Sequence, residues 1–154
     1  MTNLIERVFT NDIDGLRDSL AQGADPNKRS GDGRTPLIHA AIDGKLAVAK
    51  LLLDHGADVN AQDGLGYSAL HYSAQNYLLE MAALLIAHGA KVDAEDNHGN
   101  TPLARAAFDS KGRGALISIL LKAGADRNHR NRHGQTPLNL AQLIANYNVA
   151  QFFE

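Results

Sequence analysis

Residues 33–60 read GRTPLIHAAIDGKLAVAKLLLDHGADVN, and both ends of this stretch recur along the chain. The Thr-Pro-Leu motif near its start returns, once as a conservative variant, at intervals of 33, 33 and 35 residues. Its four copies are Thr35-Pro36-Leu37, Ser68-Ala69-Leu70, Thr101-Pro102-Leu103 and Thr136-Pro137-Leu138. A Gly-Ala marker keeps the same three intervals, and its copies begin at Gly23, Gly56, Gly89 and Gly124. Two independent markers with one period indicate stacked copies of a single unit, which present an extended surface rather than a closed pocket.

These motifs resemble the ankyrin repeat family. The family pattern is a Gly-x-Thr-Pro-Leu-His finger, a helix, a Gly turn, a second helix, and then Gly-Ala-Asp-Val-Asn. The best match runs from Gly33 through Ala40-Ala41 and Gly44 to Asn60, and the likeness covers nearly the whole chain. The resemblance implies an all-α solenoid of stacked helix-turn-helix units with hairpin-like finger loops and no true sheet.

The repeats divide the chain into units of one domain, residues 1–154. The ends differ from the middle, as the capping units of a solenoid do. The expected units are an N-terminal capping repeat (2–29), three full repeats (30–62, 63–95 and 96–130) and a short C-terminal capping repeat (131–154).

Each copy carries ordinary helix signals. A Thr or Ser hydroxyl stands where it can accept from a free N–H of the first helical turn, and Pro follows in three of the four copies at the first helical position. The second helix carries apolar residues at helical spacing, such as Val48, Leu51 and Leu52, which are expected to pack against the neighbouring copy. Gly56 and its equivalents are expected to end these helices in a left-handed conformation.

Three departures from the pattern stand out. Two extra residues fall in the inter-helix turn at 109–114, which predicts a tolerated insertion or, alternatively, a loop that contacts a partner. Tyr77 stands where the family has Gly, so either Asn76 takes the turn conformation or the turn is rebuilt, and Tyr77 is a repacked aromatic or a partner contact. The family's His after Thr-Pro-Leu is present only as His71, and the resemblance implies that it ties neighbouring fingers together.

Composition excludes several classes of protein. The net charge of −2 gives no general attraction to nucleic acid or to a membrane surface. The absence of Cys excludes disulfides and thiolate zinc sites. The longest apolar runs, such as 115–121, are too short to span a bilayer, and the first residues lack the pattern of a secretory signal. We expect a cytoplasmic monomer, although a leader that had already been removed would leave no trace in this sequence.

Signatures of catalysis, cofactor binding and metal binding are not found. The sequence has neither a phosphate-binding loop nor a Gly-x-Ser-x-Gly nucleophile elbow. His129 and His133 are four residues apart, but the Asn and Gly beside them place them on a finger rather than on a helix. Arg127, Arg130 and Arg132 complete the one basic cluster, which we interpret as a solvated edge or, alternatively, as a surface for an acidic patch on a protein partner. We expect no enzyme, no cofactor, no metal and no nucleic-acid partner.

The resemblance also implies which residues bind. In the family, the concave face formed by the finger tips and the first helices carries the variable positions. In this chain those positions hold Asp32, Arg34, Ile42 and Asp43, then Leu65, Tyr67, Gln75 and Asn76, then His98, Asn100, Phe108 and Asp109, and finally Arg132, His133, Gln135 and Leu143. Leu65, Tyr67 and Phe108 are expected to form one exposed patch with Tyr67 as its anchor, unless each packs on its own neighbours.

These observations predict a module that binds a partner protein through its concave face and finger loops. A lone recognition module acts by occupying its partner, which favours an inhibitor, an immunity-type antitoxin or a small adaptor. Fold alone does not specify function, so an enzyme with an unrecognised site and a purely structural spacer remain alternatives.

Overall fold

The repeats form a single elongated stack of helix pairs. The structure is a computed structural model that describes residues 3–144 and 148–154 of the chain. The described ranges contain nine α-helices and one 3-10 helix. Their bounds are α1 (Leu4–Thr10), α2 (Ile13–Ala21), α3 (Pro36–Ile42), α4 (Leu46–Asp54), α5 (Ala69–Gln75), α6 (Leu79–Ala87), α7 (Pro102–Asp109), α8 (Ala115–Lys122), α9 (Pro137–Leu143) and η1 (Val149–Phe153).

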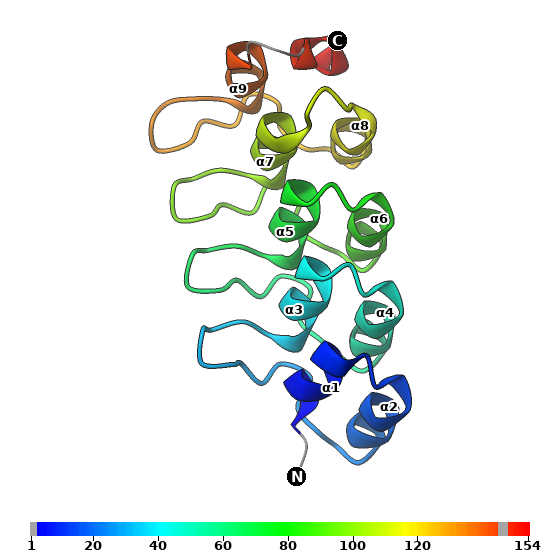
Figure 1. Cartoon of the computed structure of the whole chain (residues 1–154). Coiled ribbons are helices and arrows are strands. Elements are labelled where there is room, and N and C mark those ends of the chain that lie inside the picture. Colours follow the sequence, from blue (N-terminus) through cyan, green and yellow to red (C-terminus); the bar gives the residue numbers. More distant parts are fainter. Residues whose placement is uncertain (1–2, 145–147) are drawn as a thin grey trace.

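The helices lie in two rows. The first helices of the copies (α1, α3, α5, α7 and α9) form one row, and the second helices (α2, α4, α6 and α8) form the other (Figure 1). Finger loops project from the side of the first row, and the two chain termini lie at opposite ends of the stack (Figure 1). An isolated bridge between Gln62 and Ser68 is the one β pairing in the described part of the chain, so the expected all-α fold without a sheet is confirmed. No helix in the described ranges is long and apolar enough to cross a membrane.

The predicted helix starts are present. The hydroxyls of Thr35, Thr101 and Thr136, and that of Ser68, each accept a hydrogen bond from the backbone N–H three residues later. Pro occupies the first helical position in α3, α7 and α9, where its missing N–H leaves no bond unmade. Local sequence therefore fixes where each first helix begins.

One hydrophobic core runs through the whole stack. Leu52, Leu85 and Leu120, which occupy the same position in successive second helices, are fully buried in this core. Leu51, Leu84 and Leu121 are only partly buried and pack against the outside of the core. Small Ala residues such as Ala40 and Ala41 are also fully buried, which allows the two rows of helices to approach closely.

Tyr77 departs from the expected turn geometry. Asn76 keeps an ordinary φ of −91°, and Tyr77 itself adopts the left-handed conformation with φ of 57°. The Tyr77 hydroxyl accepts a hydrogen bond from the N–H of Leu116 at 3.3 Å, and the Arg113 guanidinium lies 3.9 Å from the centre of its ring. Helix α8 has Gly114 at its N-cap and no side-chain cap of its own, so a side chain of the preceding copy supplies the missing acceptor. These contacts offset the cost of the left-handed backbone, which is about 1–2 kcal/mol for a residue other than Gly.

The insertion is held by the same contacts. Its extra length is taken up by Lys111 (φ 52°) and Gly112 (φ 84°), and the Nε of Arg113 donates to the carbonyl of Ser110 at 2.9 Å. The packing of Arg113 on the neighbouring copy favours the interpretation of a tolerated insertion. A contact between this loop and a partner stays a prediction.

The last copy ends differently from the others. Val149 and Phe153 are buried, as the apolar pattern predicts, but residues Val149–Phe153 form a short 3-10 helix instead of a second α-helix. The Arg127 guanidinium donates to the carbonyl of Phe153 and thereby holds this segment against the finger.

Candidate functional site

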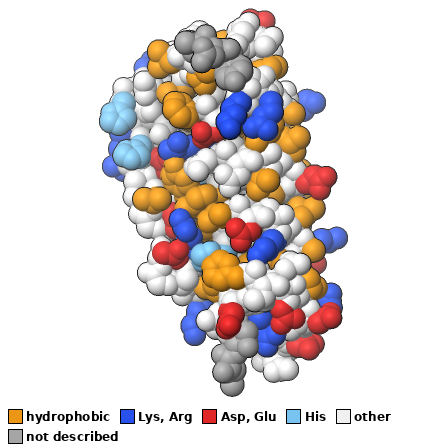
Figure 2. All heavy atoms as spheres, viewed as in Figure 1, with side chains coloured by type: hydrophobic (Ala, Val, Ile, Leu, Met, Phe, Trp, Pro, Cys, Tyr) orange, Lys and Arg blue, Asp and Glu red, His pale blue; other side chains and the backbone are white. Residues whose placement is uncertain are grey.

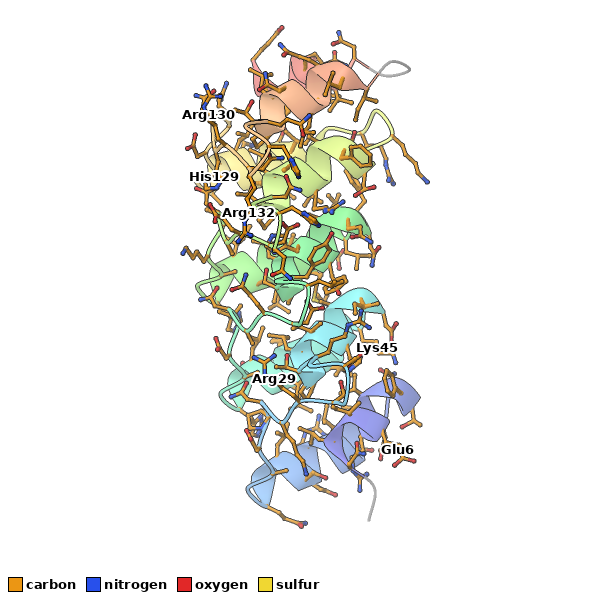
Figure 3. The ribbon with its side chains drawn as sticks, turned by 90° about the vertical axis from the view of Figure 1, so that its left-hand side faces the viewer. Glu6, Arg29, Lys45, His129, Arg130 and Arg132 are labelled. Atoms are coloured by element: carbon orange, nitrogen blue, oxygen red, sulfur yellow. The ribbon has the colours of Figure 1, made fainter. Side chains whose placement is uncertain are left out.

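Fingers and first helices together form one continuous face, which we call the concave face (Figures 1 and 3). Backbone hydrogen bonds join successive fingers: the N–H of Asn97 donates to Leu65 at 3.0 Å, and the N–H of Arg132 donates to His98 at 2.9 Å. Arg29 extends these links by donating to the carbonyl of Gln62 in the next finger at 2.8 Å. Because each finger is bonded to the next, the face is preorganised for binding.

Three of the fingers are each shaped by one short polar side chain. In three successive fingers Asp63, Asp96 and Asn131 each accept hydrogen bonds from two backbone N–H groups of their own loop. Such side chains mimic a backbone turn and therefore fix the loop locally. The side chains of Asp63 and Asp96 are 2% and 0% exposed, so their carboxylates lie beneath the binding surface and not on it.

His71 links two fingers from inside the molecule, as the family resemblance implies. Its Nδ1 accepts from the backbone N–H of Ser68 at 3.2 Å, and its Nε2 lies 2.9 Å from the carbonyl oxygen of Asn100. This geometry requires an imidazole with its proton on Nε2. Burial lowers the pKa of His71, and the charge of Arg105 lowers it further, while Asn100, Asp96 and Asp63 oppose the shift.

Stability is expected to fall as the pH drops through the acid range because of His71. The pKa of His71 lies below its ordinary value in the folded state, so the unfolded chain binds more protons between the two pKa values. The stabilisation is complete above the unfolded pKa of about 6.5 and is lost as the pH falls through the folded pKa, with a slope of at most about 1.4 kcal/mol per pH unit for one proton. Urea unfolding measured at intervals between about pH 7.5 and about pH 4.5 checks this expectation.

The matched variant is His71→Asn. Asn139 occupies the equivalent position in the last copy and forms the same reciprocal cap with Thr136, so an Asn at position 71 keeps the cap without the titration. The free energy of unfolding should change less steeply with pH in this variant than in the wild type. Burial also lowers the pKa of His39, which leaves a residual slope of the same sign. An unchanged slope would assign the effect to other groups.

Tyr67 does not form the exposed anchor that the sequence predicts. It is only 9% exposed and packs with Ile38 and Tyr72, whose ring centre lies 5.0 Å away. The Arg105 guanidinium covers the ring at 5.2 Å from its centre. The predicted patch is therefore wrong in this respect, because neighbouring copies bury the ring and leave only Leu65 (57%) and Phe108 (59%) exposed.

Arg and Tyr side chains form the base of the face in two successive interfaces. Between the first two full copies, Arg34 on the finger donates to the hydroxyl of Tyr72 at 3.2 Å, and Tyr72 donates to Asp63 at 2.5 Å. Burial and this bond to Asp63 raise the pKa of Tyr72 to about 12. At the next interface the types are exchanged, since Tyr67 lies on the finger and Arg105 on the helix. In both interfaces a guanidinium group lies over a tyrosine ring, and this cation–π attraction joins neighbouring copies.

An apolar row lies along the first helices. Each first helix has an equivalent position near its C-terminal end. From α3 to α9 this position is occupied by Ile42, Gln75, Phe108 and Leu143, at intervals of 33, 33 and 35 residues, and Phe9 of α1 lies 33 residues before Ile42. We define the apolar row as Phe9, Ile42, Phe108 and Leu143, with Gln75 as its one polar position. Phe9, Phe108 and Leu143 are 54%, 59% and 67% exposed, and Ile42 is half-buried. Figure 2 shows hydrophobic side chains at intervals along this side of the stack.

Sequence reasoning missed Phe9. The residue belongs to the N-terminal capping unit, which lacks the Thr-Pro-Leu marker, so no motif places Phe9 in register with the other copies. The repeat interval itself is the signal that identifies it, because 33 residues separate Phe9 from Ile42.

A hollow of about 180 Å³ opens between the last two first helices and their fingers. One side is apolar, with Phe108, Ala104 and Leu140, and the other carries the histidines of two successive fingers, His98 and His133. The two imidazole rings stack with their centres 6.2 Å apart. The remaining lining residues are Asn100, Arg105, Asn131 and Gln135. An engineered cavity of about 150 Å³ binds benzene, so this hollow has the size for one large apolar side chain.

The other predicted binding residues are spread along the face. Asp32, Arg34 and Asp43 lie near the N-terminal end, where Arg34 pairs with Asp32 at 3.2 Å and Asp43 pairs with Lys45 at 3.4 Å. Asn76 donates to the carbonyl of Ile42 at 3.2 Å and so ties two copies together.

The remaining predicted binding residues are Asp109 and two residues of the last finger. Asp109 is half-buried, and burial raises its pKa against the opposing charges of Arg105 and Lys111. Arg132 and His133 are exposed on the last finger, on which Figure 3 labels Arg132. In the basic cluster His129 lies 2.6 Å from Glu95 of the preceding finger, and Arg130 donates to the carbonyl of Gly134, so both side chains are held by their own and the neighbouring finger. No group of three or more His, Asp or Glu side chains within 3–144 and 148–154 is placed to hold a metal ion.

Helix pairs stacked at a fixed interval, with bonded fingers on one side, define a repeat solenoid with an extended binding face. A profile for Ankyrin repeats (3 copies) matches residues 6–96 and 51–131. The chain therefore belongs to the ankyrin repeat family, whose repeats are generally protein–protein interaction modules.

A curated relative shares a shorter segment. The potassium channel KOR1 of Oryza sativa subsp. japonica is 45% identical over 53 residues, which make up 34% of this chain and 6% of the channel. The chain thus corresponds to only a small part of that relative's length.

Proposed function

We propose that this protein binds a partner protein through its concave face and acts by occupying the partner's surface. One observation carries the proposal: within the described residues, the large apolar side chains that are exposed are Phe9, Leu65, Phe108 and Leu143. All four belong to fingers or first helices, and none belongs to the second helices. Exposed apolar side chains gathered on one face are typical of an interaction surface.

The rigidity of the face supports the same proposal. Hydrogen bonds between fingers and the stacked Arg and Tyr base hold it in place before a partner arrives, which lowers the entropy lost on binding. A face of this kind blocks the surface it covers, so we favour an inhibitor or an immunity-type antitoxin, with a small adaptor as the related possibility. In this proposal the protein acts by binding and not by catalysis.

Partner recovery by affinity capture and quantitative mass spectrometry tests the proposal. The variant Phe9→Gln/Phe108→Gln introduces at two exposed row positions the residue that Gln75 already places there, and circular dichroism verifies that the fold is retained. The matched control is Ala83→Gln, an exposed position on α6 of the second row. We expect recovery of the specific partners to fall at least about tenfold with the double variant and to stay unchanged with the control.

The same experiment separates the alternatives. Equal recovery by wild type and the double variant would remove the concave face as the binding surface. No specific partner for any of the three proteins would favour a spacer. Turnover of a small substrate by the purified protein would favour an enzyme.

A further inference from the structure

The apolar row has a spacing that selects the shape of its partner. Successive first helices pack side by side along the stack (Figure 1). Packed helices lie about 8–10 Å apart, so equivalent side chains recur about every 10 Å along the concave face. From Phe9 to Leu143 the row covers four such steps, or about 40 Å.

An α-helix matches this spacing. It rises 1.5 Å per residue, so seven residues span about 10.5 Å and return the side chain to the same side of the helix within about 20°. An extended strand covers about 10 Å in three residues, but three residues place the side chain on the opposite face. A strand would therefore meet only every second position of the row, whereas a helix with an apolar residue every seven residues meets each one.

The apolar row also indicates which residue would lie at the centre of the partner helix. At the middle copy the first helix offers Gln75 instead of an apolar side chain, and the finger of the same copy offers the exposed Leu65. Near the other end, the hollow beside Phe108 and Leu140 has the size for one large apolar side chain. His98 and His133 also line this hollow, and their ring nitrogens can form hydrogen bonds with a polar neighbour of that side chain.

Charge gives the helix a direction. Residues 1–95 contain thirteen Asp and Glu and eight Lys and Arg, whereas residues 96–154 contain four and seven. On the concave face, Glu6 is exposed at the N-terminal end and Arg132 on the last finger (Figure 3). Because a helix is positive at its N-terminus and negative at its C-terminus, a partner helix is favoured with its N-terminus over α1 and its C-terminus over α9.

We propose that the concave face binds an amphipathic α-helix of a partner protein, laid along the stack, with an apolar residue every seven positions, a basic N-terminal half and an acidic C-terminal half. This inference rests on the proposed function, because it names the partner element that the same face takes. The helix needs about 30 residues to reach from Phe9 to Leu143.

Synthetic peptides test the inference directly. The probe is a fluorescent peptide of about 30 residues, held helical by side-chain staples on its polar side, with Leu every seven residues, Gln at the central position, Lys in the N-terminal half and Glu in the C-terminal half. A first comparison peptide has the same composition with Leu every six residues, which winds the apolar positions around the helix. A second exchanges the Lys and Glu halves. Circular dichroism verifies equal helicity, and fluorescence anisotropy measures Kd.

We expect the seven-residue peptide to bind at least about tenfold more tightly than the six-residue peptide, and the charge-exchanged peptide to bind several-fold more weakly at low salt. Phe108→Gln should weaken binding of the seven-residue peptide about tenfold, and Ala83→Gln should leave it unchanged. Equal affinity for the two spacings, or no saturable binding of the seven-residue peptide, overturns the inference.

The two tests fail differently. If the peptides do not discriminate but Phe9→Gln/Phe108→Gln still abolishes partner recovery, the concave face binds an element other than such a helix. If neither assay responds to the apolar row, both the inference and the proposed function are wrong.

Discussion

Replacing Gly66 with Ala is expected to destabilise the protein by about 3 kcal/mol. Gly66 has φ of 78°, and a left-handed backbone costs a residue with a Cβ about 1–2 kcal/mol. The added Cβ would also lie 2.8 Å from the backbone nitrogen of Asn97 and 2.9 Å from the Cα of Asp96, both in the next finger. Overpacking of this kind costs about another 1–3 kcal/mol.

The Oδ1 of Asn97 would also lie 2.8 Å from the new Cβ, but turning that side chain cannot relieve the crowding, because the other two close atoms belong to the backbone. The N–H of Asn97 donates to the carbonyl of Leu65, so moving the finger away breaks the bond that joins the two fingers. The substitution therefore acts both on stability and on the spacing of the concave face. Urea unfolding followed by circular dichroism measures the loss.

Gly33→Ala is the matched control. Gly33 occupies the same position in the preceding finger with φ of 79°, but its nearest neighbour would be 3.6 Å from the new Cβ, an ordinary contact. This variant should lose only the backbone cost of about 1–2 kcal/mol. The difference between the two variants isolates the crowding between fingers, and equal losses would show that the fingers adjust freely.

The fold could be predicted from the sequence because its signals are local and repeated. Caps such as Thr35 and the Pro that follows act within one turn of helix, and four copies of the same signal at one interval leave little freedom for another architecture. The 3-10 helix at Val149–Phe153 was not predicted, because the apolar pattern of a short segment is compatible with either kind of helix.

Binding residues were harder to predict because exposure depends on neighbouring copies. Tyr67 has the position and chemistry of an anchor, but its exposure is decided by Ile38 of the preceding copy and Arg105 of the next, which lie 29 and 38 residues away in the sequence. The pairing of Tyr77 with Arg113 and Leu116 is likewise a contact between copies. The repeat interval does place residues on the same face, and Phe9, which sequence reasoning missed, lies one such interval before Ile42.

Leu85→Ala is expected to lower the free energy of unfolding far more than truncation of an exposed side chain such as Leu65 does. Leu85 lies in α6 of the middle copy, is 0% exposed, and belongs to the core that runs through the stack. Truncating a buried Leu to Ala costs about 2–5 kcal/mol, from the lost transfer free energy and from the cavity that remains. For a chain of this length, a loss of about 3 kcal/mol corresponds to a decrease in Tm of roughly 6–12 °C.

The position of Leu85 adds a second effect. In a solenoid each copy is stabilised by its contacts with the copies on either side, so weakening the middle copy also weakens the coupling between the two halves of the stack. Hydrogen exchange should therefore show reduced protection in α4, α6 and α8 together, because these helices pack on one another along the second row. Leu65→Ala, at an exposed finger position, is the control and should change stability by less than about 0.5 kcal/mol. A similar decrease in Tm for both variants would contradict the assignment of Leu85 to the shared core.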